Sequence, residues 1–253
     1  MKSILKLVSV LLLSFVSSLS VDTFAADSKE TVFITGANRG IGLALAQHFS
    51  DAGFKVIGTA RKPEQALELK KTGAQVEQLD VTDQASVDAM AQRLAETPID
   101  ILINNAGIKG SDTKDMASLD VESIEWVLNV NTLGPVRVMK ALFPNVQSSE
   151  RKVIVNISST MGSIERNTWG CCAGYRASKT ALNSINKTFA VDFGKQGVSF
   201  VVMHPGYVQT DMNDGSGNIT PGQSAVGLMN VITGLDASDN GKFYDWQGKD
   251  LPW

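Results

Sequence analysis

The chain has 253 residues, of which 43% are hydrophobic and 19% charged, and its formal net charge is −3 at pH 7. This is ordinary globular composition, and the length suits one large α/β domain better than two small ones. Lysine and arginine do not cluster, so we expect no nucleic-acid partner.

The first 25 residues differ from the rest of the chain. Lys2 and Lys6 precede the apolar run Leu7–Val16, and a polar stretch with small residues follows. This pattern is typical of a secretory signal peptide, so we expect residues 1–25 to be removed on export to the periplasm or the medium. The mature domain is then 26–253. The alternatives are a cytoplasmic protein with a misplaced start or an uncleaved membrane anchor, although the apolar run is short for a stable membrane span.

From residue 31 onward, β-branched runs alternate with helical patterns. Strands are predicted at residues 31–36, 55–60, 74–80, 99–107, 152–159, 198–206 and 241–246. Helices are predicted at residues 41–50, 86–95, 121–142 and 173–194, the third of them ending before Pro144. This alternation predicts an α/β fold with a doubly wound parallel sheet in a single domain.

One connection and one residue pair interrupt this regular pattern. The stretch 206–221 is rich in Gly, Asn and Asp, and a loop of this length is typical of a cover over a site, although it could be a long surface connection. Cys171 and Cys172 are adjacent, which is too close for an easy disulfide. Since no metal-ligand spacing occurs, we expect no metal site, and the cysteines do not reveal the redox compartment.

The segment TGANRGIG places Gly36, Gly40 and Gly42 between a predicted strand and a predicted helix. Residues without a Cβ permit a tight turn and close approach to a ligand, and the N–H groups at a helix start bind phosphate. In the first βα unit, such a turn predicts a Rossmann-type nucleotide site. Its spacing, G-x-x-x-G-x-G, departs from the commoner dinucleotide pattern.

Four segments in this order, TGANRGIG, NNAG (104–107), ISS (157–159) and YRASK (175–179), resemble the short-chain dehydrogenase/reductase family over about residues 30–253. The resemblance implies that 26–253 is an NADP(H)-binding catalytic domain. The long connection between ISS and YRASK, together with the ending LPW, resembles the branch of C-factor and sniffer-like carbonyl reductases.

Charge after the second predicted strand favours NADP(H) over NAD(H). NAD-binding folds carry an acidic residue there, whereas this chain has Arg61, and Arg39 lies in the glycine turn. Two guanidinium groups suit a 2′-phosphate, although both could be solvated surface residues. The other cofactor-binding residues that the resemblance implies are Gly36, Asn38, Gly40, Ile41, Gly42, Asp80, Val81, Asn105, Ala106, Gly107, Tyr175, Lys179, Pro205, Gly206, Val208 and Thr210.

Tyr175 and Lys179 are one helical turn apart on the same helix face. A nearby ammonium stabilises a phenolate, so we expect Lys179 to lower the pKa of Tyr175 from its ordinary value of about 10. The resemblance implies that Tyr175 donates a proton to the substrate carbonyl, that Lys179 also holds the nicotinamide ribose, and that Ser159 hydrogen-bonds the same carbonyl oxygen. Ser158 is the alternative serine, since neighbours on a strand point oppositely.

The remaining candidate positions are polar, aromatic or sulfur-containing residues outside these motifs. By resemblance, Asn131 supports a water chain to the catalytic lysine, with Asn129 as its competitor. His204 has no matching acid or nucleophile in the sequence, so we expect a structural role. Trp169 and the two cysteines line the substrate pocket or only pack their loop.

The sequence thus predicts an NADPH-dependent enzyme that reduces an aldehyde or ketone to an alcohol. The alternatives are an alcohol dehydrogenase working in the oxidative direction and a nucleotide-binding signalling protein related to C-factor. The expected partner is a small carbonyl or alcohol substrate. The resemblance also implies a homodimer or homotetramer built through helices 121–142 and 173–194.

Overall fold

The computed structural model describes residues 29–111 and 115–253, so the predicted signal peptide lies outside the described residues. Seven strands form one parallel sheet in the order β3-β2-β1-β4-β5-β6-β7. Their bounds are β1 (Thr31–Ile34), β2 (Lys55–Ala60), β3 (Gln75–Gln78), β4 (Ile101–Asn104), β5 (Val153–Ile157), β6 (Ser199–His204) and β7 (Phe243–Asp245). The predicted single-domain, doubly wound Rossmann-type fold is confirmed.

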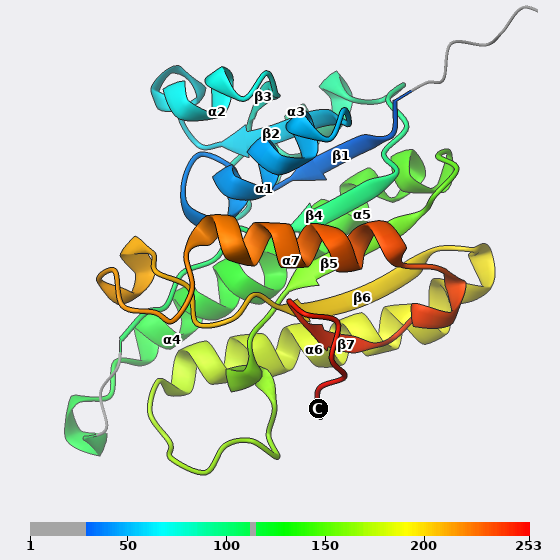
Figure 1. Cartoon of the computed structure of the whole chain (residues 1–253). Helices are drawn as coiled ribbons and strands as arrows, with labels where there is room; N and C mark the ends of the chain where they lie inside the picture. The colour runs from blue at the N-terminus through cyan, green and yellow to red at the C-terminus, as the bar shows by residue number, and fades with distance from the viewer. Residues whose placement is uncertain (1–28, 112–114) are drawn as a thin grey trace, which may run out of the picture.

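Helices cover both faces of the sheet (Figure 1). One face packs against α1 (Gly40–Asp51), α2 (Leu67–Lys71) and α7 (Pro221–Gly234), and the other against α3 (Gln84–Arg93), α5 (Gly134–Gln147) and α6 (Ala173–Phe193). Successive strand residues enter opposite cores: Val32 and Ile34 of β1 join the first, and Phe33 joins the second. Burial on both faces explains why the central strands read as continuous apolar runs.

The helix predicted at residues 121–142 is interrupted, so that prediction is wrong in detail. It consists of α4 (Val121–Leu128), a π-helical turn (Asn129–Leu133) and α5. Pro144 lies inside α5 rather than beyond its end. A proline removes a single N–H donor, and this one is exposed in the last turn, so the helix continues past it. π-Turns inside α-helices are frequent at functional sites, and this one contains Asn131.

Two helices were not predicted, α2 and α7. Helix α7 begins with a capping box, in which Thr220 accepts a hydrogen bond from the Gln223 N–H (3.2 Å), with Pro221 in the first turn. That T-P-x-Q signal, residues 220–223, is legible in the sequence at the end of the irregular stretch 206–221. Among the described residues, no helix has both the length and the apolar character needed to cross a membrane.

Candidate active site

The predicted site residues gather at the carboxyl edge of the sheet. Gly36 follows β1, Asn105 follows β4, Ser159 follows β5 and Pro205 follows β6. The strand order reverses between β1 and β4, and doubly wound sheets bind ligands in the crevice at such a point. The fold therefore brings together segments that are far apart in the chain.

The glycine turn is closely packed against the loop after β4. Gly36 and Gly40 both have left-handed φ values, +63° and +55°. A Cβ on Gly42 would stand 2.4 Å from the Gly36 carbonyl oxygen and 2.5 Å from Nδ2 of Asn105. The Asn105 amide donates to the carbonyl oxygens of Thr35 (3.0 Å) and Gly36 (3.2 Å). The absence of a Cβ at Gly42 thus lets the start of α1 pack directly against the glycine turn and Asn105.

Thr35 is a site residue that the sequence reasoning missed. Its hydroxyl oxygen accepts hydrogen bonds from the N–H groups of Asn105 (2.9 Å) and Ala106 (3.0 Å). It therefore joins the ends of β1 and β4, where two of the expected cofactor-binding segments meet. Its position as the last residue before the glycine turn was the available signal.

The loop at residues 206–220 lies over the glycine turn. A Cβ on Gly40 would be 3.6 Å from Cγ2 of Thr210, and the orange loop and blue turn lie at the same end of the sheet in Figure 1. The loop is ordered by its own hydrogen bonds, including Gln209 N–H to the Ile219 carbonyl (2.9 Å) and Thr210 N–H to Asn213 Oδ1 (3.1 Å). Thr210 therefore lies beside the glycine turn, and a cover over a bound ligand stays a prediction for this loop.

The two candidate phosphate-binding arginines, Arg39 and Arg61, are exposed at the rim of the turn. Arg39 Nη1 lies 3.8 Å from Asp211 Oδ2, with both side chains more than two thirds exposed. Asp80 has a lowered pKa: burial raises it, but hydrogen bonds from Thr82 and the charge of Arg61 outweigh burial. Arg61, which follows β2, therefore lies near Asp80, which follows β3, at the carboxyl edge of the sheet.

Ser159 and Lys179 surround Tyr175 at the first turn of α6. The Ser159 hydroxyl lies near enough to that of Tyr175 to lower the tyrosine's pKa in part. Lys179 Nζ donates to the Ile157 carbonyl oxygen (2.9 Å) and lies 5.8 Å from the centre of the Tyr175 ring. Ser158 instead donates to Asn183 Oδ1 (2.7 Å), so the two neighbouring serines point apart. It is Ser159 that the fold brings to the tyrosine.

The expectation that Lys179 lowers the pKa of Tyr175 is wrong. Burial raises the pKa of Tyr175 to about 12, and the Ser159 hydroxyl opposes this only in part. Burial also lowers the pKa of Lys179 to about 8, and its ammonium bonds a backbone carbonyl. Desolvation disfavours the charged form of each group. The tyrosine hydroxyl therefore keeps its proton at neutral pH.

Asn131 is fully buried in the π-turn and connects the loop after β4 with α6. Its amide donates to the Ile108 carbonyl (2.8 Å) and to Ser178 Oγ (3.0 Å), while its oxygen accepts from Ile108 N–H (2.8 Å). Ser178 immediately precedes Lys179. Asn129 accepts from Arg137 Nη2 (2.8 Å) instead, so of the two asparagines it is Asn131 that joins the site.

Cys171 and Cys172 form a disulfide, contrary to the expectation from their adjacency. Both residues have left-handed φ values, +68° and +57°, a backbone state that the argument from spacing did not consider. Cys172 is the N-cap residue of α6, three positions before Tyr175. The bridge therefore lies at the end of the connection that begins at Ser159.

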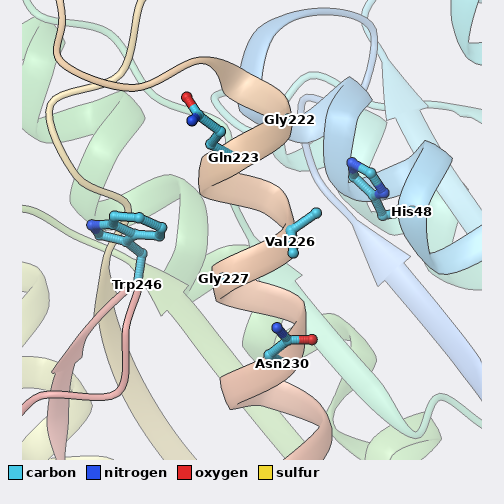
Figure 2. Close-up of a pocket in the computed structure, with 7 residues that line it drawn as sticks. All are labelled: His48, Gly222, Gln223, Val226, Gly227, Asn230 and Trp246. Atoms are coloured by element: carbon cyan, nitrogen blue, oxygen red, sulfur yellow. The ribbon is translucent and has the colours of Figure 1, made fainter.

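His204 and the groove along α7 do not join these residues. Burial lowers the pKa of His204 to about 4, so the imidazole is neutral, which suits the expected structural role. In Figure 2, Val226 of α7 points toward His48 of α1, and Trp246 lies on the other side of the helix. The residues that line this groove are His48, Gly222, Gln223, Val226, Gly227, Asn230 and Trp246. None is a predicted site residue, so we place the active site at the carboxyl edge of the sheet.

Known relatives identify the family of this chain. The family model of short chain dehydrogenases matches residues 30–218. The chain is 35% identical over 165 residues to C-signal of Myxococcus xanthus, covering 65% of this chain and 99% of the relative.

Solved structures of carbonyl reductases are also similar to this chain. Carbonyl reductase Sniffer of D. melanogaster superposes with a TM-score of 0.82 at 29% identity, covering 89% of this chain and all of that one. The NADPH-bound carbonyl reductase from chicken fatty liver superposes with a TM-score of 0.81 at 32% identity, covering 89% and 99%. The chain therefore belongs to the short-chain dehydrogenase/reductase family of oxidoreductases and lies on its carbonyl reductase branch.

Proposed function

We propose that this oxidoreductase uses NADPH to reduce the carbonyl group of an aldehyde or ketone to an alcohol. The observation that carries the proposal is the Tyr175 hydroxyl, which keeps its proton and has Ser159 and Lys179 beside it. Reduction of a carbonyl requires a proton donor at the oxygen, and a tyrosine with a pKa of about 12 is protonated at neutral pH. The oxidative alternative uses the same tyrosine as a base, so the ratio of NADPH to NADP⁺ and the pH, rather than any residue, distinguish the two directions.

The cradle for the cofactor fits a dinucleotide. A Cβ at Gly42 would clash with the Gly36 carbonyl oxygen and distort the turn, and the start of α1 offers N–H groups to a pyrophosphate. Arg39 and Arg61 suit the 2′-phosphate of NADP(H), and the chicken carbonyl reductase, 32% identical, is described with NADPH bound. When bound, NADPH supplies the hydride.

The chain's own residues would then act on the carbonyl oxygen. Ser159 orients it by a hydrogen bond, and Tyr175 donates its proton as negative charge develops there. Lys179 places a positive charge near the phenolate that forms and is the candidate partner of the nicotinamide ribose. Asn131 holds the turn that carries Lys179 through its bond to Ser178 Oγ.

The direct test is NADPH oxidation with a panel of aldehydes and ketones, with the alcohol product quantified. Turnover with stoichiometric alcohol supports the proposal. Tight NADPH binding without turnover of any carbonyl would favour the signalling alternative related to C-factor. Turnover of alcohols with NADP⁺ but not of carbonyls with NADPH would favour the oxidative dehydrogenase.

Reduction is expected to weaken as pH rises through about 8. Lys179 loses its charge near this value, while Tyr175 keeps its proton to about 12. Below pH 8 both groups are in the active form, and above it kcat/KM should fall about tenfold per pH unit. Initial rates between about pH 6 and pH 10 provide the measurement. A profile that stays flat to pH 10 would contradict this assignment of Lys179.

Gly42→Ala is expected to weaken NADPH binding by at least about tenfold. The new methyl would stand 2.4 Å from the Gly36 carbonyl oxygen, so the turn must shift away from its phosphate-binding shape. Fluorescence titration with NADPH measures the change. The control is Gly234→Ala in α7, where the added methyl meets open space. Unchanged affinity in Gly42→Ala would contradict the proposed cradle.

We also propose that the protein is exported. Support comes from the leader-like residues 1–25 and, separately, from the Cys171–Cys172 disulfide, since disulfides persist in oxidising compartments. Protein from the exported fraction should lack residues 1–25, have no thiol reactive to maleimide, and gain about 2 Da on reduction. Intact-mass analysis of fractionated cells tests both features. An intact Met1 on cytoplasmic protein with two free thiols would contradict export.

We also propose that the protein forms a homodimer or homotetramer through the helices in residues 121–142 and 173–194. Trp126 of α4, Leu133 of the π-turn and Val191 of α6 are each about half exposed or more, which supports a further contact of these helices. Light scattering measures the oligomeric state. A monomer at micromolar concentration would contradict the proposal.

A further inference from the structure

Arg176 follows Tyr175 in the chain, and its side chain is buried (7% exposed). Nε donates to the carbonyl oxygens of Gly170 (3.1 Å) and Cys171 (3.1 Å), and Nη1 donates to that of Met161 (3.4 Å). The guanidinium carbon lies 4.6 Å from the centre of the Trp169 ring, within cation–π range. These contacts all lie in the connection between Ser159 and Tyr175.

The partners of Arg176 mark the two ends of that connection. Met161 belongs to the short 3₁₀ turn after Ser159, and its N–H donates to Ser159 Oγ (3.1 Å). Gly170 and Cys171 lie directly before α6, which presents Tyr175. One planar cation thus ties the turn that holds the serine to the backbone that leads into the tyrosine helix. A lysine ammonium lacks the forked geometry that reaches all these acceptors at once.

The backbone that Arg176 holds is in a costly conformation. Gly170, Cys171 and Cys172 are three consecutive residues with left-handed φ values of +70°, +68° and +57°. A residue with a Cβ adopts the left-handed backbone conformation only at a cost, so contacts with its surroundings must hold it there. Here the surroundings are the Arg176 bonds to two of the three carbonyls and the disulfide between the two cysteines.

Burying a cation without a carboxylate is also costly. The hydrogen-bond acceptors found for Arg176 are backbone carbonyls, and its Nη2 has no hydrogen-bond partner within the part of the chain that the structure describes. A neutral side chain packed there would avoid this cost. A buried guanidinium at position 176 is explained if the shape of the Ser159–Tyr175 connection matters more than its stability.

We propose that Arg176 is a positioning residue for the reaction: it clamps both ends of the Ser159–Tyr175 connection and so sets the serine hydroxyl against the tyrosine hydroxyl. This rests on the proposed carbonyl reduction. Arg176 acts through its neighbours and does not touch the reacting atoms. Its loss should therefore lower kcat for the carbonyl substrate and leave cofactor binding, which uses the glycine turn, unchanged.

The test compares Arg176→Ala, Arg176→Lys and the matched control Arg166→Ala, an exposed arginine of the same connection. Because a displacement of about 1 Å in reacting groups costs up to about 100-fold, we expect kcat/KM to fall 10- to 100-fold in Arg176→Ala. Arg176→Lys should recover part of the loss, and Arg166→Ala should stay within twofold of wild type. NADPH affinity should stay within twofold in all three variants.

Amide hydrogen exchange gives a readout that does not depend on turnover. In Arg176→Ala, exchange should accelerate in residues 161–174 and remain as in wild type in the glycine turn. If wild type reduces no carbonyl, the proposed function fails, while this exchange result still decides whether Arg176 holds the connection. A folded Arg176→Ala protein with wild-type kcat, or with unchanged exchange in residues 161–174, would overturn the positioning role. A loss of kcat/KM that is caused by weaker NADPH binding would also overturn the positioning role.

Discussion

Tyr175→Phe is expected to lower kcat for carbonyl reduction by about 10³-fold while NADPH affinity stays unchanged. General acid catalysis by a positioned side chain contributes about 10²- to 10⁴-fold, and the substitution removes only the hydroxyl that carries the proton. The phenyl ring keeps its buried volume, so the fold should be retained. Single-turnover and steady-state rates with NADPH measure the loss, and fluorescence titration measures the affinity.

The matched control for this substitution is Tyr244→Phe on β7, whose hydroxyl donates to Asp239 Oδ1 (2.7 Å). It removes the same hydroxyl oxygen at a position outside the segments that follow β1, β4, β5 and β6. We therefore expect kcat to stay within about twofold of wild type. Ser159→Ala should cost about 10²-fold in kcat, and a larger loss for Ser158→Ala would exchange the roles of the two serines. A Tyr175→Phe enzyme with unchanged kcat would make the proposed mechanism wrong.

The double substitution Arg39→Ala/Arg61→Ala is expected to reduce the preference for NADPH over NADH by about 10²- to 10³-fold. Each charge-assisted hydrogen bond to the 2′-phosphate contributes roughly 1.5–2 kcal/mol, or about 10- to 30-fold. Most of the change should appear as weaker NADPH binding, because NADH lacks the phosphate. The ratio of kcat/KM for the two cofactors provides the measurement.

Two further variants sharpen that test. Lys55→Ala removes an exposed cation from the opposite end of β2, so it should leave the cofactor ratio within twofold of wild type. Asp211→Asn removes the carboxylate that lies 3.8 Å from Arg39, so NADPH affinity should stay equal or rise slightly. Equal affinity of the wild-type enzyme for NADH and NADPH would contradict the cofactor proposal.

The strands were predictable from the sequence because their chemistry is local. Strand β2 has the predicted bounds, Lys55–Ala60, since an apolar run there is bounded by Gly53 and Arg61. The glycine turn and the Tyr175–Lys179 spacing were likewise readable, because each depends on residues only a few positions apart. These short-range patterns were enough to identify the family and the strand ends where the candidate site residues lie.

What could not be predicted depends on contacts between distant segments. In the π-turn, the side chain of Asn131 forms hydrogen bonds to Ile108 and Ser178. These two residues come from other parts of the chain, so local sequence does not reveal the turn. The disulfide requires left-handed backbone at Cys171 and Cys172, which residue spacing does not reveal. The pKa of Tyr175 rises because folding buries the hydroxyl, and pairing it with Lys179 in the sequence gave the opposite sign.

The central place of β1 has a consequence for biosynthesis. This strand lies between β2 and β4, and the N–H of Thr31 donates to the Asp100 carboxylate (2.7 Å), 69 positions later. Parallel pairing over such separations folds slowly, so the start of the chain waits for later segments before its core can close. If the protein is exported as an unfolded chain, its cofactor cradle forms only after translocation, where NADPH would have to be acquired.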